Sequence, residues 1–215
     1  LGIVVLDFGG QYAHLIANRI RRLNVWAEIR PPDTPIDELR HADGLILSGG
    51  PSSVYAPDRP PFEEAVLHAG LPILGLCYGH QLLCHNLGGQ VERGERMEFG
   101  AASLSVTSAT GVLAGLQASE RIWMSHRDLV HGVPAGFEVL ANTGDCPVAA
   151  MGDDKRRIYG LQFHPEVTHT ESGMKILENF VDLCGCARDW TMANFIELET
   201  ARLQQQTAGR KVFLL

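Results

Sequence analysis

Short apolar runs and amphipathic stretches alternate along the first half of the chain. Four apolar runs predict buried strands, and the third leads into a glycine-rich turn: 3–7, 25–30, 44–51 and 72–76. Three segments predict helices, and the last two end at a glycine: 12–23, 62–70 and 79–89. The proline-containing stretch 31–39 predicts a loop. Strands that alternate with helices are typical of a mostly parallel sheet covered by helices on both faces.

The second half of the sequence has a different pattern. Short strand-like pieces within 91–150, separated by turns, predict an antiparallel extension of the sheet. A strand over 157–166 and a helix over 171–184 follow. We therefore predict an α/β fold of three layers, α/β/α, with a central mostly parallel sheet plus a small antiparallel extension.

The C-terminal stretch predicts a separate unit. A helix over 190–206 is followed by a turn and by the apolar end KVFLL at 211–215, which predicts the first strand of a further domain. We therefore assign 1–188 to one domain and 189–215 to a helical linker with that strand. Because the sequence does not start with Met, we also expect it to begin a few residues late.

Composition narrows the class of protein. The chain has 215 residues, 45% hydrophobic and 20% charged, as expected of one large domain with or without an appendage. Its net charge of −7 argues against a nucleic-acid partner. No apolar run approaches the roughly 20 residues of a membrane span, and the N-terminus lacks the features of a signal peptide. Five scattered cysteines then fit reduced thiols in a cytoplasmic protein.

Cys77 is the strongest candidate for chemistry. It follows an apolar strand and precedes a helix, within Gly75-Leu76-Cys77-Tyr78-Gly79. This is the glycine-flanked pattern of a sharp strand-to-helix turn that presents a nucleophile at its tip. The thiol would lie at a helix N-terminus, where the dipole favours a thiolate, and Tyr78 N–H would point toward an oxyanion. A buried cysteine that only packs is the alternative, and this segment alone does not exclude it.

A base for this thiol is predicted in LQFHPE. Strand alternation places Gln162, His164 and Glu166 on one side, and Pro165 ends the ladder. A carboxylate beside an imidazole fixes its tautomer and stabilises its cation, as a Cys–His pair requires. A partly buried histidine paired with a glutamate for structural reasons is the alternative.

A third feature follows another predicted strand. Ser48-Gly49-Gly50-Pro51 lies where ligands bind in open α/β sheets, and the Gly50 N–H could join Tyr78 N–H in an oxyanion hole. An ordinary loop is the alternative. A candidate nucleophile, a histidine–glutamate pair and an oxyanion donor thus occur at three strand ends. Their joint occurrence by chance is far less probable than the occurrence of any one of them.

Other candidate sites are weaker. Cys184-x-Cys186 lacks the second pair of a metal site, so two packing thiols at a helix end account for it better, and we predict no metal. The charge run 153–157 is typical of a solvated turn. No glycine-rich nucleotide-binding motif is present in the sequence.

The motifs SGGP, GLCYGHQ and QFHPE, in this order, resemble the class I (triad-type) glutamine amidotransferases, whose fold is flavodoxin-like. The stretches LDFGGQY, MSHRDLV, HPEVTHT and CARDW are similar to the branch of that family found in GMP synthetases. The resemblance implies that Cys77 is the nucleophile, His164 the base and Glu166 its orienting partner. It assigns the oxyanion hole to Gly50 and Tyr78. It implies that L-glutamine is contacted by Gln81 and by a loop formed by Ser125, His126, Arg127 and Asp128.

The same resemblance implies a reaction. The chain would hydrolyse glutamine to glutamate and ammonia without a cofactor. The ammonia would aminate ATP-activated XMP to GMP in a C-terminal ATP-pyrophosphatase domain, which would need ATP and Mg²⁺ and would follow this chain. The full-length enzyme would be a homodimer. A γ-glutamyl hydrolase or peptidase of the same fold, or a catalytically silent regulatory module, are the alternatives.

Two positions depart from the family pattern. Arg127 stands where the family usually has the glycine of SHGD, and Met97 stands where it often has an arginine before EFG. If position 127 needs a positive φ, Arg127 is expected to be strained and to alter how glutamine is held.

Overall fold

The computed structural model describes residues 2–208, apart from the side chains of 94–96 and 198. Over that range, nine strands form one sheet in the order β2-β1-β3-β4-β9-β8-β7-β5-β6. Five neighbouring strands are parallel: β2 (Ala27–Arg30), β1 (Ile3–Leu6), β3 (Gly44–Leu47), β4 (Ile73–Leu76) and β9 (Ile158–Leu161). Four continue the sheet with antiparallel pairing: β8 (Ala150–Asp153), β7 (Glu138–Asn142), β5 (Gln90–Val106) and β6 (Ser119–Gly132).

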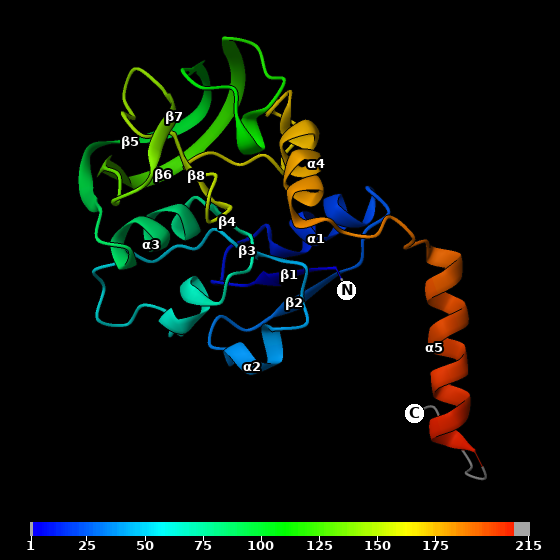
Figure 1. Ribbon diagram of the computed structural model, residues 1–215. Helices are drawn as coiled ribbons and strands as arrows, with labels where there is room; N and C mark the ends of the chain where they lie inside the picture. The colour runs from blue at the N-terminus through cyan, green and yellow to red at the C-terminus, as the bar shows by residue number, and fades with distance from the viewer. Residues whose placement is uncertain (1, 209–215) are drawn as a thin grey trace.

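Helices cover both faces of the parallel part (Figure 1). The described helices are α1 (Ala13–Arg21), α2 (Ile36–Leu39), η1 (Glu64–His68), α3 (Tyr78–Asn86), η2 (Gly111–Leu113), α4 (Gly173–Cys184) and α5 (Met192–Thr207), of which α5 does not cover the sheet. Successive residues of a strand point to opposite faces. Accordingly Ile3 and Val5 pack in one core with α1 and α4, while Val4 and Leu6 pack in a second core with α2, η1 and α3.

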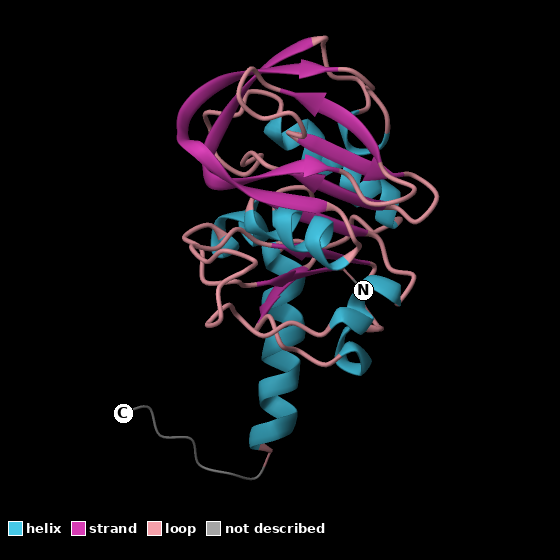
Figure 2. Cartoon of the chain, turned by 90° about the vertical axis from the view of Figure 1, so that its left-hand side faces the viewer, coloured by secondary structure: helices cyan, strands magenta, loops and turns pink. Residues whose placement is uncertain are grey.

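The two cores confirm the predicted three-layer α/β/α fold. The antiparallel part is continuous with the parallel sheet and contains its two longest strands, β5 with 17 residues and β6 with 14. Figure 2 shows these strands curving over the top of the molecule, above the parallel strands. The antiparallel extension of the sheet is therefore larger than the small extension that the sequence predicts.

Two local predictions differ from the structure. The predicted helix 62–70 is only a short 3₁₀ turn, and the predicted loop 31–39 contains the single turn of α2. These differences are connected, because the Glu63 carboxylate accepts the Ile36 N–H at 2.9 Å. Glu63 thereby caps the start of α2 from a distant part of the chain, so local spacing could not show it.

The predicted C-terminal helix over 190–206 is confirmed as α5. It extends away from the rest of the domain in Figure 1. Its start is attached by Trp190 N–H, which donates to Asn24 O at 2.9 Å, and by Phe195, which stacks on Trp26 at 5.4 Å. The strand predicted at 211–215 lies outside the described residues, and the boundary after 188 stays a prediction. Among the described helices, none is both long and apolar enough to cross a membrane.

Candidate active site

The carboxyl ends of the parallel strands β1, β3, β4 and β9 meet at one edge of the sheet. The loops that leave these ends contain the segments singled out from the sequence: 7–10, 48–51, 77–79 and 162–166. Ligands of open α/β sheets bind at such edges. The three predicted strand-end features therefore share one location.

Cys77 occupies the tip of the turn between β4 and α3, with φ 52° and ψ −104°. Its N–H donates to Leu161 O at 2.8 Å, and its carbonyl accepts the Gln81 N–H at 3.1 Å. A non-glycine residue in this conformation is strained by about 1–3 kcal/mol and persists only where its surroundings fix it. Here β9 and α3 fix it, and they hold the thiol at the sheet edge.

The glycines on either side of Cys77 allow the strand and the helix to approach closely. A Cβ at Gly75 would lie 2.5 Å from Gly79 O, and a Cβ at Gly79 would lie 2.3 Å from Leu47 O. Both contacts are shorter than carbon and oxygen tolerate. The Gly-x-Cys-x-Gly spacing is therefore a packing requirement of this turn.

His164 and Glu166 lie close together, as predicted, but strand periodicity is not the reason. β9 ends at Leu161, and both residues lie in the turn that follows. His164 N–H leaves the β9 ladder to donate to Trp123 O at 3.1 Å, and Pro165 has no N–H to continue a ladder. Within this turn His164 Nδ1 lies 2.7 Å from Glu166 Oε1. The pairing occurs; the predicted strand over 157–166 is wrong beyond Leu161.

The electrostatics of this pair favour a charged imidazole. Burial by itself would lower the pKa of His164, but hydrogen bonds to Cys77 and Glu166 and the charges of both groups raise it to about 10. The Glu166 side chain is 1% exposed and that of His164 is 5% exposed. His164 is therefore protonated at neutral pH, beside a thiol that can supply the proton.

The loop 48–51 lies directly against Cys77 and His164. A Cβ at Gly49 would be 3.2 Å from His164 Cε1 and 3.5 Å from Cys77 Cβ, so a side chain here would enter the site. In the described part of the chain, the N–H groups of Gly50 and Tyr78 donate to no other residue. Both remain available to an oxyanion formed next to Cys77.

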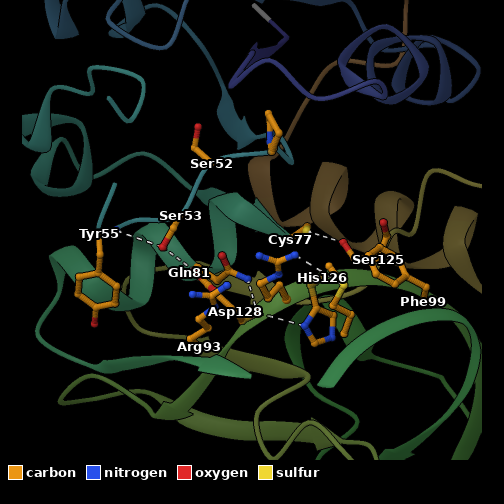
Figure 3. Close-up of a pocket in the computed structure, with 14 residues that line it drawn as sticks. Ser52, Ser53, Tyr55, Cys77, Gln81, Arg93, Phe99, Ser125, His126 and Asp128 are labelled. Atoms are coloured by element: carbon orange, nitrogen blue, oxygen red, sulfur yellow. Dashed lines mark hydrogen bonds between the residues drawn. The ribbon is translucent and has the colours of Figure 1, made fainter. Parts of the chain in front are cut away.

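A cavity of about 700 Å³ opens in front of the thiol (Figure 3). It is lined by Gly50, Pro51, Ser52, Ser53, Tyr55, Cys77, Gln81, Arg93, Met97, Phe99, Ser125, His126, Arg127 and Asp128. A second hollow of about 310 Å³ reaches Cys77 from the side of His164 and the loop 9–12. Cys77 thus lies where two openings meet, with room for a small substrate on one side.

The predicted substrate segment Ser125–Asp128 is not a loop but part of strand β6. The Ser125 carbonyl lies 3.5 Å from Cys77 Sγ. The Asp128 carbonyl accepts Gln81 Nε2 at 2.6 Å, and its carboxylate accepts the Ser53 hydroxyl at 2.5 Å (Figure 3). These hydrogen bonds fix the wall of the cavity from α3 and from the loop after β3.

His126 lines the cavity, but its side chain is buried and hydrogen bonded within the wall. Its Nε2 lies 3.0 Å from Glu98 Oε2 and its Nδ1 lies 3.1 Å from Asp128 O. Burial lowers the pKa of His126, and the Glu98 carboxylate opposes that effect. Both ring nitrogens of His126 thus have partners, one on β5 and one on its own strand, which hold the imidazole in the cavity wall.

Arg127 is not among the described residues with a positive φ, so the strain expected there does not arise. Its Nη2 lies 3.8 Å from Met97 Sδ, which brings the two departures from the family pattern into contact. Arg93 lines the same cavity. Within the described residues, neither arginine forms an ion pair with a carboxylate. The cavity wall therefore carries two cations that lack a carboxylate partner there.

Comparison with protein families agrees with this geometry. The family model described as glutamine amidotransferase class-I matches residues 4–184. The chain belongs to the class-I glutamine amidotransferase family.

The chain is similar to part of longer curated relatives. The GMP synthase (glutamine-hydrolyzing) of Geobacillus kaustophilus is 47% identical over 213 residues, and that of Heliobacterium modesticaldum is 46% identical over 213 residues. Each match covers 98% of this chain but 42% of the relative. The chain therefore spans less than half the length of these relatives and matches their amidotransferase part.

Solved structures of amidotransferases share the fold. A crystal structure from Thermoplasma acidophilum, described as that of one GMP synthase subunit, has a TM-score of 0.75 and 32% identity, covering 93% of this chain and 98% of that one. A glutamine amidotransferase from Thermotoga maritima has a TM-score of 0.64 at 21% identity, covering 96% and 89%. The second likeness concerns the fold alone.

Three residues of the amidotransferase site were missed from the sequence. Thr170 Oγ1 donates to His164 O at 2.6 Å and accepts the Trp123 N–H at 3.1 Å, which fixes the turn that contains His164. The Tyr12 ring meets the His164 ring edge-on at 5.2 Å. Thr170 and Tyr12 lie within HPEVTHT and LDFGGQY, but those letters do not show which side chains face the site. Nothing in the sequence singled out Arg93.

In the part of the chain that the structure describes, no group of three or more metal-ligating side chains occurs.

A buried histidine of α3 predicts how the stability of this amidotransferase domain depends on pH. His80 is fully buried, with Nε2 at 3.1 Å from Val148 O, and burial lowers its pKa to about 3. In the unfolded chain it titrates near its ordinary pKa of about 6.5. Its contribution to stability is therefore complete above pH 6.5 and is lost as the pH falls, by up to about 1.4 kcal/mol per pH unit.

His80→Gln tests this directly, because the glutamine amide can still donate to Val148 O. We expect denaturant unfolding between about pH 6 and pH 4 to show a shallower loss of stability in the variant, by close to one proton. His164 is present in both proteins, so its contribution to the slope cancels from the comparison. Equal slopes for the two proteins would refute a neutral His80.

Proposed function

We propose that this chain hydrolyses L-glutamine to L-glutamate and ammonia, with Cys77 as nucleophile, His164 as acid and base and Glu166 as its partner. One observation carries the proposal. A buried histidine, hydrogen bonded to a glutamate and with its pKa raised to about 10, adjoins a thiol at the end of a cavity of about 700 Å³. This arrangement supports a thiolate–imidazolium pair ready to attack a carbonyl carbon.

In the first half of the reaction, the Cys77 thiolate attacks the side-chain amide carbon of glutamine. The oxygen of that amide becomes an oxyanion and accepts the N–H groups of Gly50 and Tyr78. The imidazolium of His164 gives its proton to the amide nitrogen, the carbon–nitrogen bond breaks and ammonia leaves. A γ-glutamyl thioester on Cys77 and a neutral His164 remain.

In the second half, a water molecule attacks the thioester carbon while His164 takes its proton. The carbon–sulfur bond breaks, glutamate leaves, and the thiolate–imidazolium pair is restored. Glu166 stabilises the imidazolium in both half-reactions and holds the ring in one orientation. The steps need no group beyond these side chains and water, so the proposal includes no cofactor.

The cavity wall supports one orientation of the substrate. With the amide at Cys77, the α-carboxylate of glutamine would face Arg127 and Arg93, and its ammonium would face the Asp128 carboxylate. Arginine pairs with carboxylates through its planar fork of donors. Gln81 would act by holding Asp128, since its amide is already engaged with Asp128 O and Gln162 Oε1.

Arg127→Gly, which restores the residue usual in the family, tests this orientation. We expect KM for glutamine to rise roughly fivefold with kcat nearly unchanged, because an exposed ion pair contributes about 1 kcal/mol. Arg127→Lys, which keeps the charge, is the control and should fall between the two. In steady-state assays, converting the α-carboxylate of glutamine to an amide should cost the wild type more affinity than it costs Arg127→Gly, in which only Arg93 remains to face the carboxylate. An unchanged KM would contradict the role of Arg127.

We further propose that the ammonia is used in a larger enzyme. The relatives named GMP synthase are more than twice as long as this chain, which supports a C-terminal ATP-pyrophosphatase part that binds ATP and Mg²⁺ and aminates ATP-activated XMP to GMP. A homodimer of the full enzyme and a cytoplasmic location complete the proposal.

The proposed activity is tested by incubating the chain with glutamine and measuring ammonia and glutamate. We expect equal amounts of both, and a higher rate when the C-terminal part of a GMP synthase relative, XMP, ATP and Mg²⁺ are added. GMP should then form from glutamine. If glutamate is released from γ-glutamyl peptides but neither glutamate nor ammonia is released from glutamine, the hydrolase alternative holds. If wild type and Cys77→Ala release equally little even with the added part, the chain is a silent module.

A further inference from the structure

Cys184, Gly185 and Cys186 form the C-terminal end of α4, away from the candidate active site. A Cβ at Gly44, the first residue of β3, would lie 2.3 Å from Cys184 Sγ. The two cysteines therefore lie at the amino edge of the parallel strands, whereas Cys77 lies at the carboxyl edge. Both are partly exposed and both contact the core.

The end of α4 turns Cys186 back toward Cys184. Gly185 adopts the left-handed conformation, with φ 68° and ψ 28°. Gly185 N–H donates to Asp182 O at 3.0 Å, and Cys186 N–H donates to Val181 O at 3.4 Å, so the chain reverses at the end of the helix. In this turn the two thiols lie close enough for each to shift the pKa of the other. Only one residue separates the two cysteines in the sequence.

The two thiols differ in character. The Cys184 thiol lowers the pKa of Cys186, against burial and Asp43, which raise it, and Arg188 adds to the lowering. Cys184 is the inner thiol and its pKa is raised by the Cys186 thiol and by burial. By contrast, burial raises the pKa of both Cys84 and Cys146 to about 12. Reactive cysteines are accessible to solvent. Cys184 and Cys186 are partly exposed, whereas Cys84 and Cys146 are buried.

We propose that Cys184 and Cys186 form a peroxide-sensitive dithiol that closes reversibly to an intrachain disulfide. The Cys186 thiolate attacks one oxygen of hydrogen peroxide, the oxygen–oxygen bond breaks and hydroxide leaves, so that Cys186 is oxidised to a sulfenic acid. The Cys184 sulfur then attacks the Cys186 sulfur, the sulfur–oxygen bond breaks, and the thiol proton leaves with the hydroxyl group as water. A dithiol reductant restores both thiols by exchange.

Two features of the site favour this chemistry over metal binding or simple packing. In the described part of the chain, these thiols belong to no cluster of three or more metal ligands. The left-handed glycine has no side chain, so the turn can tighten between the two sulfurs without a clash. The disulfide would lie just before the segment in which Trp190 attaches the start of α5. Oxidation would therefore occur close to the junction between the domain and α5.

The test uses the whole chain carrying Cys77→Ala, so that the active-site thiol does not compete. After treatment with hydrogen peroxide, free thiols are alkylated and every cysteine is mapped by mass spectrometry. We expect Cys184 and Cys186 to become linked to each other and protected from alkylation, at least about tenfold faster than Cys84 or Cys146 is oxidised. Dithiothreitol should restore both thiols.

Single variants separate the roles of the two thiols. In Cys184→Ser, dimedone should trap a sulfenic acid on Cys186, because the second thiol is missing. In Cys186→Ser, oxidation of Cys184 should slow at least about tenfold. If a variant does not fold, the time course of alkylation in the unoxidised Cys77→Ala chain replaces it, and Cys186 should be labelled before Cys184. Oxidation no faster than at Cys84 and Cys146, or labelling of Cys184 before Cys186, would overturn the proposal.

Discussion

Cys77→Ala is expected to abolish glutamine hydrolysis, with kcat reduced by a factor of about 10⁴ or more. In the proposed mechanism the Cys77 thiolate forms the bond to the substrate, and alanine has no group that could replace it. Ammonia release under saturating glutamine is the measurement, with circular dichroism to show that the variant is folded. Residual activity within tenfold of the wild type would show that another group starts the reaction.

A matched variant, Cys77→Gly, separates the thiol from the backbone conformation that presents it. Because φ 52° and ψ −104° favour glycine, we expect Cys77→Gly to be as inactive as Cys77→Ala but more stable by about 1–2 kcal/mol. Denaturant unfolding of the two variants measures this difference. Equal stabilities would mean that the turn carries no strain, although the nucleophile itself would be unaffected by that result.

Glu166→Gln is expected to lower kcat by about 100-fold or more while the chain stays folded. The buried carboxylate lies 2.7 Å from His164 Nδ1, and its charge helps to hold the pKa of His164 at about 10. Without that charge the imidazolium is less stable in both half-reactions. The variant keeps the size of the side chain, so the loss reports on charge and not on packing.

The pH profile of Glu166→Gln gives a second readout. The pKa of His164 should fall toward its ordinary value of about 6.5, so the alkaline limb of kcat should move to lower pH. Glu171→Gln, an exposed neighbour in the same loop, is the control and should leave both rate and profile unchanged. A wild-type profile in Glu166→Gln would show that Glu166 only packs beside His164.

Local spacing predicts well the turn between β4 and α3 that presents Cys77, and it does so for a physical reason. The run 72–76 is buried on both faces of the sheet, so it is apolar at every position, and the glycines at 75 and 79 are required by backbone contacts within the same turn. The pattern and the contacts that explain it lie within a few residues. The alternation of strands and helices predicts the three layers in the same way.

The pairing of His164 with Glu166 is predicted correctly but for the wrong reason. Strand periodicity extends the strand to Glu166, whereas β9 ends at Leu161 and a turn brings His164 and Glu166 together. That turn depends on a hydrogen bond to Trp123, on a strand 41 positions earlier in the sequence. A single sequence shows that these residues are near one another, but not what holds them.

The cavity wall is the least predictable part of the site. The sequence suggests a loop at Ser125–Asp128, yet this segment pairs with β5 in a register that sets Glu98 opposite His126. This pairing turns the His126 imidazole inward and leaves Arg127 on the cavity side. Because register depends on two distant strands, neither the inward histidine nor the contact between Arg127 and Met97 could be obtained from local pattern.

Covalent labelling of the chain with a glutamine analogue whose side-chain amide is replaced by an electrophilic ketone tests the central claim most directly. Mass spectrometry of the digested protein should find one adduct, on Cys77, and excess glutamine should prevent it. His164→Ala should slow the labelling, because the thiolate loses its partner. An adduct on another cysteine, or none on Cys77 while the protein hydrolyses glutamine, would contradict the account.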